Sequence, residues 1–207
     1  MNVQFARRML GIYVGVRDTP KSLKRFNVQR RNGQPQRFDK FAIRVMNSTL
    51  RTIEDMECFF PASLQEALEY LADEKTCGRP LAGGTDLMVQ WEAGALPIPE
   101  KIVNVLNLPE LKGISEENGL IVIGGGVTHT EIRGSSLVLQ YLPSLAAAAA
   151  TVGGFQMQNM GTIAGSMANA SPAGDPEPSL LITDGTVIVG SLSDEREIPL
   201  RNFWKGY

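Results

Sequence analysis

The chain has 207 residues, of which 43% are hydrophobic, 20 are basic and 22 are acidic, giving a formal net charge of −2. This composition is ordinary for a globular protein with one sizeable domain or two small ones. The sequence has no run of about 18 apolar residues, so a membrane span is not expected, and the expected location is the cytoplasm. Two cysteines and one histidine are too few for a four-ligand zinc or iron–sulfur site made of Cys and His. Any iron–sulfur chemistry must therefore lie on another chain.

The positive charge is concentrated at the N-terminal end. Residues 1–55 hold 12 basic and 4 acidic side chains, whereas the rest of the chain holds 8 basic and 18 acidic ones. Residues 21–44 combine basic side chains with scattered Asn, Gly and Pro, a composition typical of disorder. An export-type leader and a nucleic-acid-binding arm are the alternatives. Because strand and helix signals begin at Met56, we favour a natural start at Met46 or Met56, and we expect residues 1–55 to be a basic leader that is disordered or outside the fold.

Residues 56–115 predict a small unit of alternating strands and helices. Residues 58–60 form the expected first strand, and Ser63-x-x-Glu66 is a capping box that begins a helix. Apolar residues follow at helical spacing, at Leu64, Ala67, Leu68 and Leu71. A β-α-β-α-β pattern is completed by an extended segment, a helix and a strand at 79–82, 86–92 and 101–105.

A run of small residues, Ala82-Gly83-Gly84-Thr85-Asp86, separates the second expected strand from the following helix. Glycine lacks a Cβ, so it allows tight turns and leaves backbone N–H groups open to an anion. The N-terminus of the next helix would add partial positive charge. The run is therefore a candidate phosphate-binding loop, with an ordinary strand-to-helix turn as the alternative.

Residues 116–207 predict a second unit that contains hairpins and helices. Asn118-Gly119 is a hairpin signal before a strand at 120–123. Gly124-Gly125-Gly126 then predicts an ordinary turn, with a phosphate loop as the alternative. The other expected elements are a helix from Thr128-x-x-Glu131 towards Tyr141, a helix from Pro143 to 153–154, a helix at 178–183, and strands at 186–190 and 197–200.

Residues 155–175 lack a regular pattern and predict a long polar loop. Loops of this length inside a compact domain are usually functional. The segment contains Gly161-Thr162-Ile163-Ala164-Gly165-Ser166, a second small-residue run whose hydroxyls are hydrogen-bond donors. Asp175 suits ribose hydroxyls because a carboxylate accepts their hydrogen bonds, although it could instead cap a turn before Pro176. Two such loops could hold the two phosphates of a dinucleotide from opposite sides.

No set of catalytic side chains stands out in the sequence. His129 would need an orienting partner to act as a general base, and Glu131, two residues later on the expected helix, does not face it. Cys58 and Cys77 are expected to be core or surface thiols. No catalytic residue and no metal ligand is therefore predicted, and a cofactor is expected to carry the chemistry.

Four segments in this order resemble the FAD-binding medium subunit of the molybdenum hydroxylases, the family that includes carbon monoxide dehydrogenase and xanthine dehydrogenase. The segments are Phe60-Pro61-Ala62-Ser63-Leu64-Gln65-Glu66-Ala67-Leu68, Pro80-Leu81-Ala82-Gly83-Gly84-Thr85-Asp86-Leu87, 123–128 and 156–175. Residues 198–207 resemble the end of the same FAD domain. The resemblance implies an α+β fold, a two-lobed FAD-binding domain with a small β-α-β lobe at 56–115 and an antiparallel-sheet lobe at 116–207.

The resemblance also implies a site and a function. The FAD pyrophosphate would lie between the lobes, on the two small-residue loops. Electrons would come from a molybdenum-cofactor large subunit and an iron–sulfur small subunit, and would pass through FAD to an acceptor such as NAD, ferredoxin or a quinone. No nucleic-acid partner is expected. The implied cofactor-binding residues are Ala82, Gly83, Gly84, Thr85, Asp86, Asn159, Gly161, Thr162, Ala164, Gly165, Ser166 and Asp175.

The sequence departs from the family pattern at three points. Gln158 stands where the family often has arginine, which would remove one charged contact. Ala164 stands where glycine is common, so its methyl group would crowd the phosphate loop slightly. The family's C-terminal domain is missing, so we expect a chain truncated after the FAD domain. The alternatives are a stand-alone FAD-dependent oxidoreductase of related fold and an inactive truncated fragment.

Overall fold

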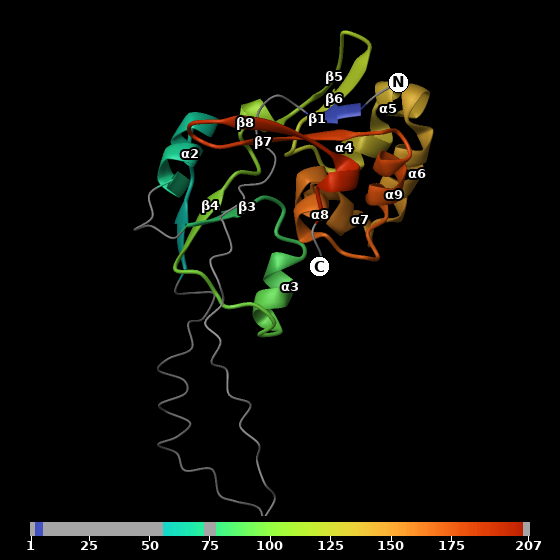
Figure 1. Cartoon of the computed structure of the whole chain (residues 1–207). Coiled ribbons are helices and arrows are strands. Elements are labelled where there is room, and N and C mark those ends of the chain that lie inside the picture. The colour runs from blue at the N-terminus through green and yellow to red at the C-terminus, as the bar shows by residue number, and fades with distance from the viewer. Residues whose placement is uncertain (1–2, 6–55, 73–77, 205–207) are drawn as a thin grey trace, which may run out of the picture.

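The structure, a computed structural model, describes residues 3–5, 56–72 and 78–204 and contains two separate sheets (Figure 1). Most of the predicted leader and Cys77 lie outside the described residues. None of the described helices is long and apolar enough to cross a membrane.

The first lobe is built on a parallel three-stranded sheet in the order β2-β4-β3. Helix α2 connects the first two strands along the chain, and α3 connects the last two, which confirms the predicted β-α-β-α-β order. The bounds are β2 (Glu57–Phe59), α2 (Leu64–Ala72), β3 (Arg79–Leu81), α3 (Leu87–Glu92) and β4 (Lys101–Asn104).

A small apolar core holds the first lobe together. Ala67 on α2 is fully buried in the same cluster as Val103 on β4, because the apolar positions of α2 recur once per helical turn. Phe59 and Tyr70 stack at 4.3 Å between ring centroids and join β2 to α2. The cluster ends at Leu111 in the short 3-10 helix η2 (Pro109–Leu111).

The second lobe is built on a five-stranded sheet in the order β5-β6-β1-β7-β8. Strands β5 and β6 form one antiparallel hairpin, and β7 and β8 form another, as the sequence predicts. Strand β1 lies between the hairpins and is parallel to both neighbours, so the sheet is mixed. The sequence did not predict this strand. The bounds are β1 (Val3–Phe5), β5 (Ile114–Glu117), β6 (Leu120–Ile123), β7 (Thr186–Gly190) and β8 (Glu195–Pro199).

The helices of the second lobe lie together beside this sheet (Figure 1). Alternate residues of β6 and β7, such as Ile121 and Val187, point into the core to which most of these helices contribute. The 3-10 helix η3 (Leu200–Asn202) follows β8. The helices are α4 (His129–Gly134), α5 (Ser136–Tyr141), α6 (Pro143–Thr151), α7 (Phe155–Met160), α8 (Ile163–Asn169) and α9 (Pro176–Leu181).

Two expectations about this helical layer were wrong. The helix predicted to run from Thr128 towards Tyr141 is divided into two, because Ser135 has extended backbone and caps α5 with its side chain. The loop predicted at 155–175 contains α7 and α8. Its second helix forms because Thr162 accepts a hydrogen bond from the Gly165 N–H and so acts as its N-cap.

Candidate functional site

The two small-residue runs meet where the lobes touch. A Cβ on Gly83 would collide with the carbonyl oxygen of Met160, so only glycine allows the first loop to approach the end of α7. A Cβ on Gly161 would lie 3.3 Å from the Thr85 hydroxyl oxygen, which places the first loop beside the second. The side chain of Gln90 also donates a 3.1 Å hydrogen bond to Asn169, across the same junction. The structure thus brings the two predicted loops together.

The turn at Gly124–Gly126 is the scaffold of the second loop. The Ala164 N–H donates to the Gly125 carbonyl at 3.2 Å, and the Ile163 N–H donates to the Val127 carbonyl at 3.0 Å. Thr128 and Thr162 form an isolated antiparallel bridge. The backbone of this turn therefore serves the protein's own hydrogen bonding, in agreement with the ordinary turn that the sequence predicts.

The two loops differ in the backbone donors that they offer to a ligand. The N–H groups of Ile163, Ala164 and Gly165 all donate within the protein, the last to the Thr162 hydroxyl at 3.1 Å. Within the described part of the chain, the four consecutive N–H groups of residues 83–86 donate to no protein acceptor. An unpaired run of this kind is where an anion finds donors. The partial positive charge expected at the N-terminus of α3 is small, because this helix has only six residues.

Hydroxyl and amide groups lie on the two loops and on the helices next to the second loop. Thr85 and Ser166 contribute partly buried hydroxyls, and the Ser166 oxygen lies 3.2 Å from Nε2 of His129. Thr130 donates to the side-chain oxygen of Asn159 at 2.6 Å, which leaves the exposed amide nitrogen of Asn159 available. The junction therefore combines backbone donors from the first loop with side-chain donors from the second lobe.

A buried carboxyl group near the junction escaped sequence reasoning. Glu177 is only 8% exposed, and neither of its carboxylate oxygens has a hydrogen-bond partner among the described residues. Gly174 makes room for it, because a Cβ there would collide with the carboxylate. Burial raises the pKa of Glu177, and the nearby carboxylates of Asp175 and Asp86 raise it further. The sequence around Glu177, where it lies between Pro176 and Pro178, gives no sign that its carboxyl group is buried.

His129 is also buried, with 1% of its surface exposed. Burial lowers the pKa of the imidazole, and the negative charge of Asp175 opposes that shift. Asp86 and Asp175 themselves are exposed at the edge of the junction. The carboxylates suit hydroxyl donors such as a ribose better than they suit phosphate, which would be repelled.

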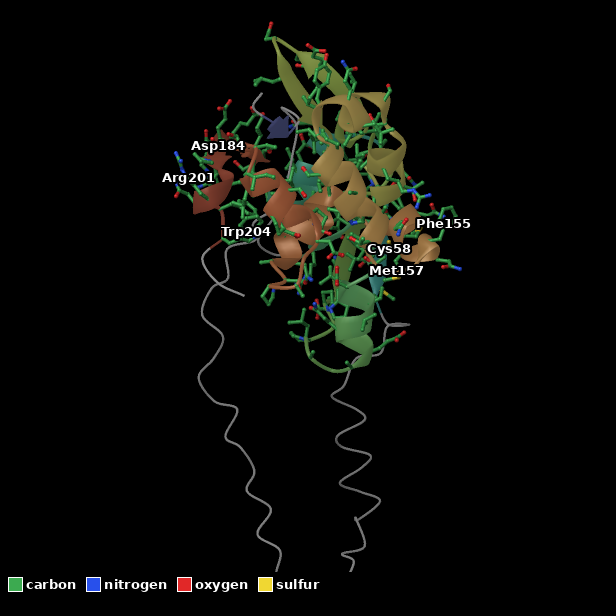
Figure 2. The ribbon with its side chains drawn as sticks, turned by 90° about the vertical axis from the view of Figure 1, so that its right-hand side faces the viewer. Cys58, Phe155, Met157, Asp184, Arg201 and Trp204 are labelled. Atoms are coloured by element: carbon green, nitrogen blue, oxygen red, sulfur yellow. The ribbon has the colours of Figure 1, made fainter. Side chains whose placement is uncertain are left out.

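The structure gives Gln158 a structural role. Its amide nitrogen donates to the Ala150 carbonyl at 2.9 Å, and its oxygen accepts from Nη1 of Arg133 at 2.8 Å. The Arg133 guanidinium lies 5.5 Å from the ring centroid of Phe155, which stands at the surface (Figure 2). Both partners of Gln158 lie outside the small-residue loops. The methyl group of Ala164 packs against the core of the second lobe.

The chain matches a known family over residues 54–207, described as the FAD binding domain in molybdopterin dehydrogenase. It is 33% identical over 159 residues to the nicotinate dehydrogenase FAD-subunit of Eubacterium barkeri, covering 74% of this chain and 52% of that one. It is 34% identical over 146 residues to the xanthine dehydrogenase FAD-binding subunit of Escherichia coli O157:H7, covering 70% and 49%.

A solved structure, quinoline 2-oxidoreductase from Pseudomonas putida 86, superposes with a TM-score of 0.68 at 32% identity. The match covers 73% of this chain and 53% of that one.

This two-lobed α+β domain has backbone donors at the junction of its lobes that find no acceptor among the described residues, an arrangement suited to an anionic cofactor. The chain belongs to the family of FAD binding domains in molybdopterin dehydrogenases. This membership confirms the predicted fold class and the predicted cofactor, FAD. The chain spans about half the length of the curated relatives that it matches.

Proposed function

We propose that this chain is the FAD-binding subunit of a molybdenum hydroxylase and that it holds the FAD pyrophosphate at the junction of its lobes. The observation that carries the proposal is the run of four N–H groups at residues 83–86 that find no acceptor among the described residues, located where the two small-residue loops touch. Backbone donors that the protein does not use are available to an anionic ligand without rearrangement of the fold.

Each predicted residue has a place in this proposal. The N–H groups of residues 83–86 bind the pyrophosphate, and the hydroxyls of Thr85, Thr162 and Ser166 add donors to it. Asp175 accepts hydrogen bonds from ribose hydroxyls, and Asn159 offers its amide nitrogen to the cofactor. Ala82, Gly161, Ala164 and Gly165 keep side-chain bulk away from the backbone at the junction. The lobes in this proposal are residues 56–115 and 116–207.

Bound FAD would supply the electron-transfer chemistry, since flavins accept and release electrons in oxidoreductases. The protein groups bind and orient the cofactor, and none is required to move a proton. In this proposal electrons arrive from a molybdenum-cofactor large subunit and an iron–sulfur small subunit and leave to NAD, ferredoxin or a quinone. The names of the relatives, which identify them as FAD subunits of dehydrogenases, support the role of an FAD-binding subunit within a larger enzyme.

Titration of the purified full chain with FAD, followed by flavin fluorescence, tests the binding step. The unaltered protein should bind FAD, and Thr85→Val should weaken binding about tenfold because a charge-assisted hydrogen bond is lost. The matched control is Thr186→Val in β7, remote from the junction, which should leave affinity unchanged. Absence of FAD uptake by the unaltered chain would overturn the proposal.

The partner assignment needs a separate measurement. Affinity purification of the tagged chain from its host should recover a molybdenum-containing subunit and an iron–sulfur subunit. Substrate oxidation by the FAD-loaded chain without those subunits would instead favour a stand-alone oxidoreductase.

A further inference from the structure

His129 is enclosed at the point where the loops converge. Its N–H donates to the Gly161 carbonyl at 3.1 Å, so its main chain is tied to the second loop. Its ring carbon Cδ2 would lie only 3.1 Å from a Cβ placed on Gly161. The imidazole therefore lies beside the backbone of the second loop, and only a residue without a Cβ at position 161 leaves room for it.

The two ring nitrogens of His129 have different surroundings. Nε2 lies 3.2 Å from the hydroxyl oxygen of Ser166, whereas Nδ1 is buried without a hydrogen-bond partner among the described residues. A neutral imidazole carries its hydrogen on only one of these nitrogens. A hydrogen on Nδ1 would be a buried, unsatisfied N–H donor, which is rarer in proteins than an unsatisfied acceptor. The surroundings therefore select the tautomer with its hydrogen on Nε2.

Burial also keeps the ring neutral near pH 7, because it lowers the pKa of His129. The negative charge of Asp175, just before α9, acts on the ring and opposes the lowering of its pKa. A neutral ring with hydrogen on Nε2 can only donate to the Ser166 oxygen. The Ser166 hydroxyl hydrogen is then left to donate to a different acceptor.

We propose that His129 is a positioning residue that donates from Nε2 to the Ser166 oxygen and so directs the Ser166 hydroxyl hydrogen at a phosphate oxygen of FAD. A phosphate oxygen accepts hydrogen bonds and cannot donate them, so it needs a serine whose hydrogen is free. This inference rests on the proposed function, because it needs the pyrophosphate at the junction.

A pair of amide substitutions separates this role from simple packing. The amide nitrogen of glutamine can reach the position of Nε2, whereas that of the shorter asparagine reaches towards Nδ1. His129→Gln should keep the affinity for FAD within about twofold, and His129→Asn should weaken it about tenfold. Equal loss in both variants, with unfolding transitions like that of the unaltered protein, would overturn the proposal.

A double-mutant cycle tests whether His129 acts through Ser166. Ser166→Ala should weaken FAD binding about tenfold, and adding His129→Asn should cause no further loss. Additive losses would overturn the inference about His129. The proposed function would still stand, because the unaltered chain would still bind FAD. Failure of the unaltered chain to bind FAD would overturn the proposed function itself.

The tautomer can be measured without any ligand. The chain contains a single histidine, so the ¹⁵N resonances of its imidazole need no assignment by mutation. We expect the pattern of a neutral ring with hydrogen on Nε2 at pH 7, before and after addition of FAD. A ring with hydrogen on Nδ1, or a charged ring, would overturn the proposal even if every variant failed to fold.

Discussion

Gly83 and Met160 are in backbone contact, so that any Cβ on Gly83 would strike the Met160 carbonyl oxygen. We expect Gly83→Ala to lower the free energy of unfolding by about 1–3 kcal/mol, because overpacking moves the loops apart. Gly134→Ala is the matched control, since among the described residues no atom beyond its chain neighbours and its own helix backbone lies within 4 Å of its Cβ position. Urea unfolding of both variants checks the prediction, and equal stability would contradict it.

The stability of the fold should depend on the ionisation of Glu177. Its pKa is raised above the ordinary value of 4.5 in the folded state, so the folded protein keeps this proton when the unfolded chain has released it. The contribution of Glu177 to stability is therefore full below pH 4.5 and is lost as pH rises through the folded pKa. Glu177→Gln should remove this decline and stabilise the fold at neutral pH by about 1–3 kcal/mol.

Chemical unfolding of the unaltered protein and of Glu177→Gln between pH 4 and 8 measures this effect. Glu195→Gln, at an exposed position, is the control and should follow the unaltered protein. A constant difference between Glu177→Gln and the unaltered protein across this range would refute the assignment.

An arginine at position 158 should be harmful in this chain. Gln158 is 4% exposed and accepts a 2.8 Å hydrogen bond from the guanidinium of Arg133, which is itself exposed, so Gln158→Arg would place a cation at a buried position next to a second cation. We expect a loss of about 1–3 kcal/mol in the free energy of unfolding, partly recovered by Arg133→Ala in the same chain. Gln156→Arg, on the exposed side of α7, should have little effect. Thermal unfolding of these variants measures the effect. If Arg133→Ala recovers none of the stability lost on Gln158→Arg, charge repulsion is excluded as the cause.

FAD should stabilise the chain through its pyrophosphate. At a free FAD concentration 100 times the dissociation constant, the free energy of unfolding should rise by about 2.7 kcal/mol. Riboflavin has the same ring system but no phosphate, so it should produce little stabilisation at the same concentration. The measurement is the midpoint of thermal unfolding against ligand concentration. An equal shift with riboflavin would place the main contacts on the ring system.

Local signals in the sequence identified much of this fold correctly. Asn118 and Gly119 have φ values of 52° and 77° and join β5 to β6, because these residues tolerate left-handed backbone in a two-residue hairpin turn. Thr128 and Glu131 form the complete capping box at the start of α4. Such signals are readable because the interacting groups are neighbours in the chain.

Other features depend on partners that are distant in the chain. Helix α7 lacks a sustained run of apolar residues at helical spacing, and one of its side chains, Gln158, is held by Ala150 and Arg133. The spacing of Ile163 and Met167, both fully buried, was the available sign of α8. The small residues of the site can be recognised in the sequence. Which of their backbone N–H groups donate within the protein depends on how the loops pack, so the sequence does not show it.

The Thr128–Thr162 bridge and the contact between Gly83 and Met160 join segments that are far apart in the sequence. Such contacts form only after long loops have closed, at a cost in chain entropy. We therefore expect the junction to assemble late in folding, after hairpins such as that of β5 and β6. Changes at a late-forming contact mainly alter the unfolding rate. FAD bound there would lengthen the lifetime of the folded chain and leave its folding rate almost unchanged.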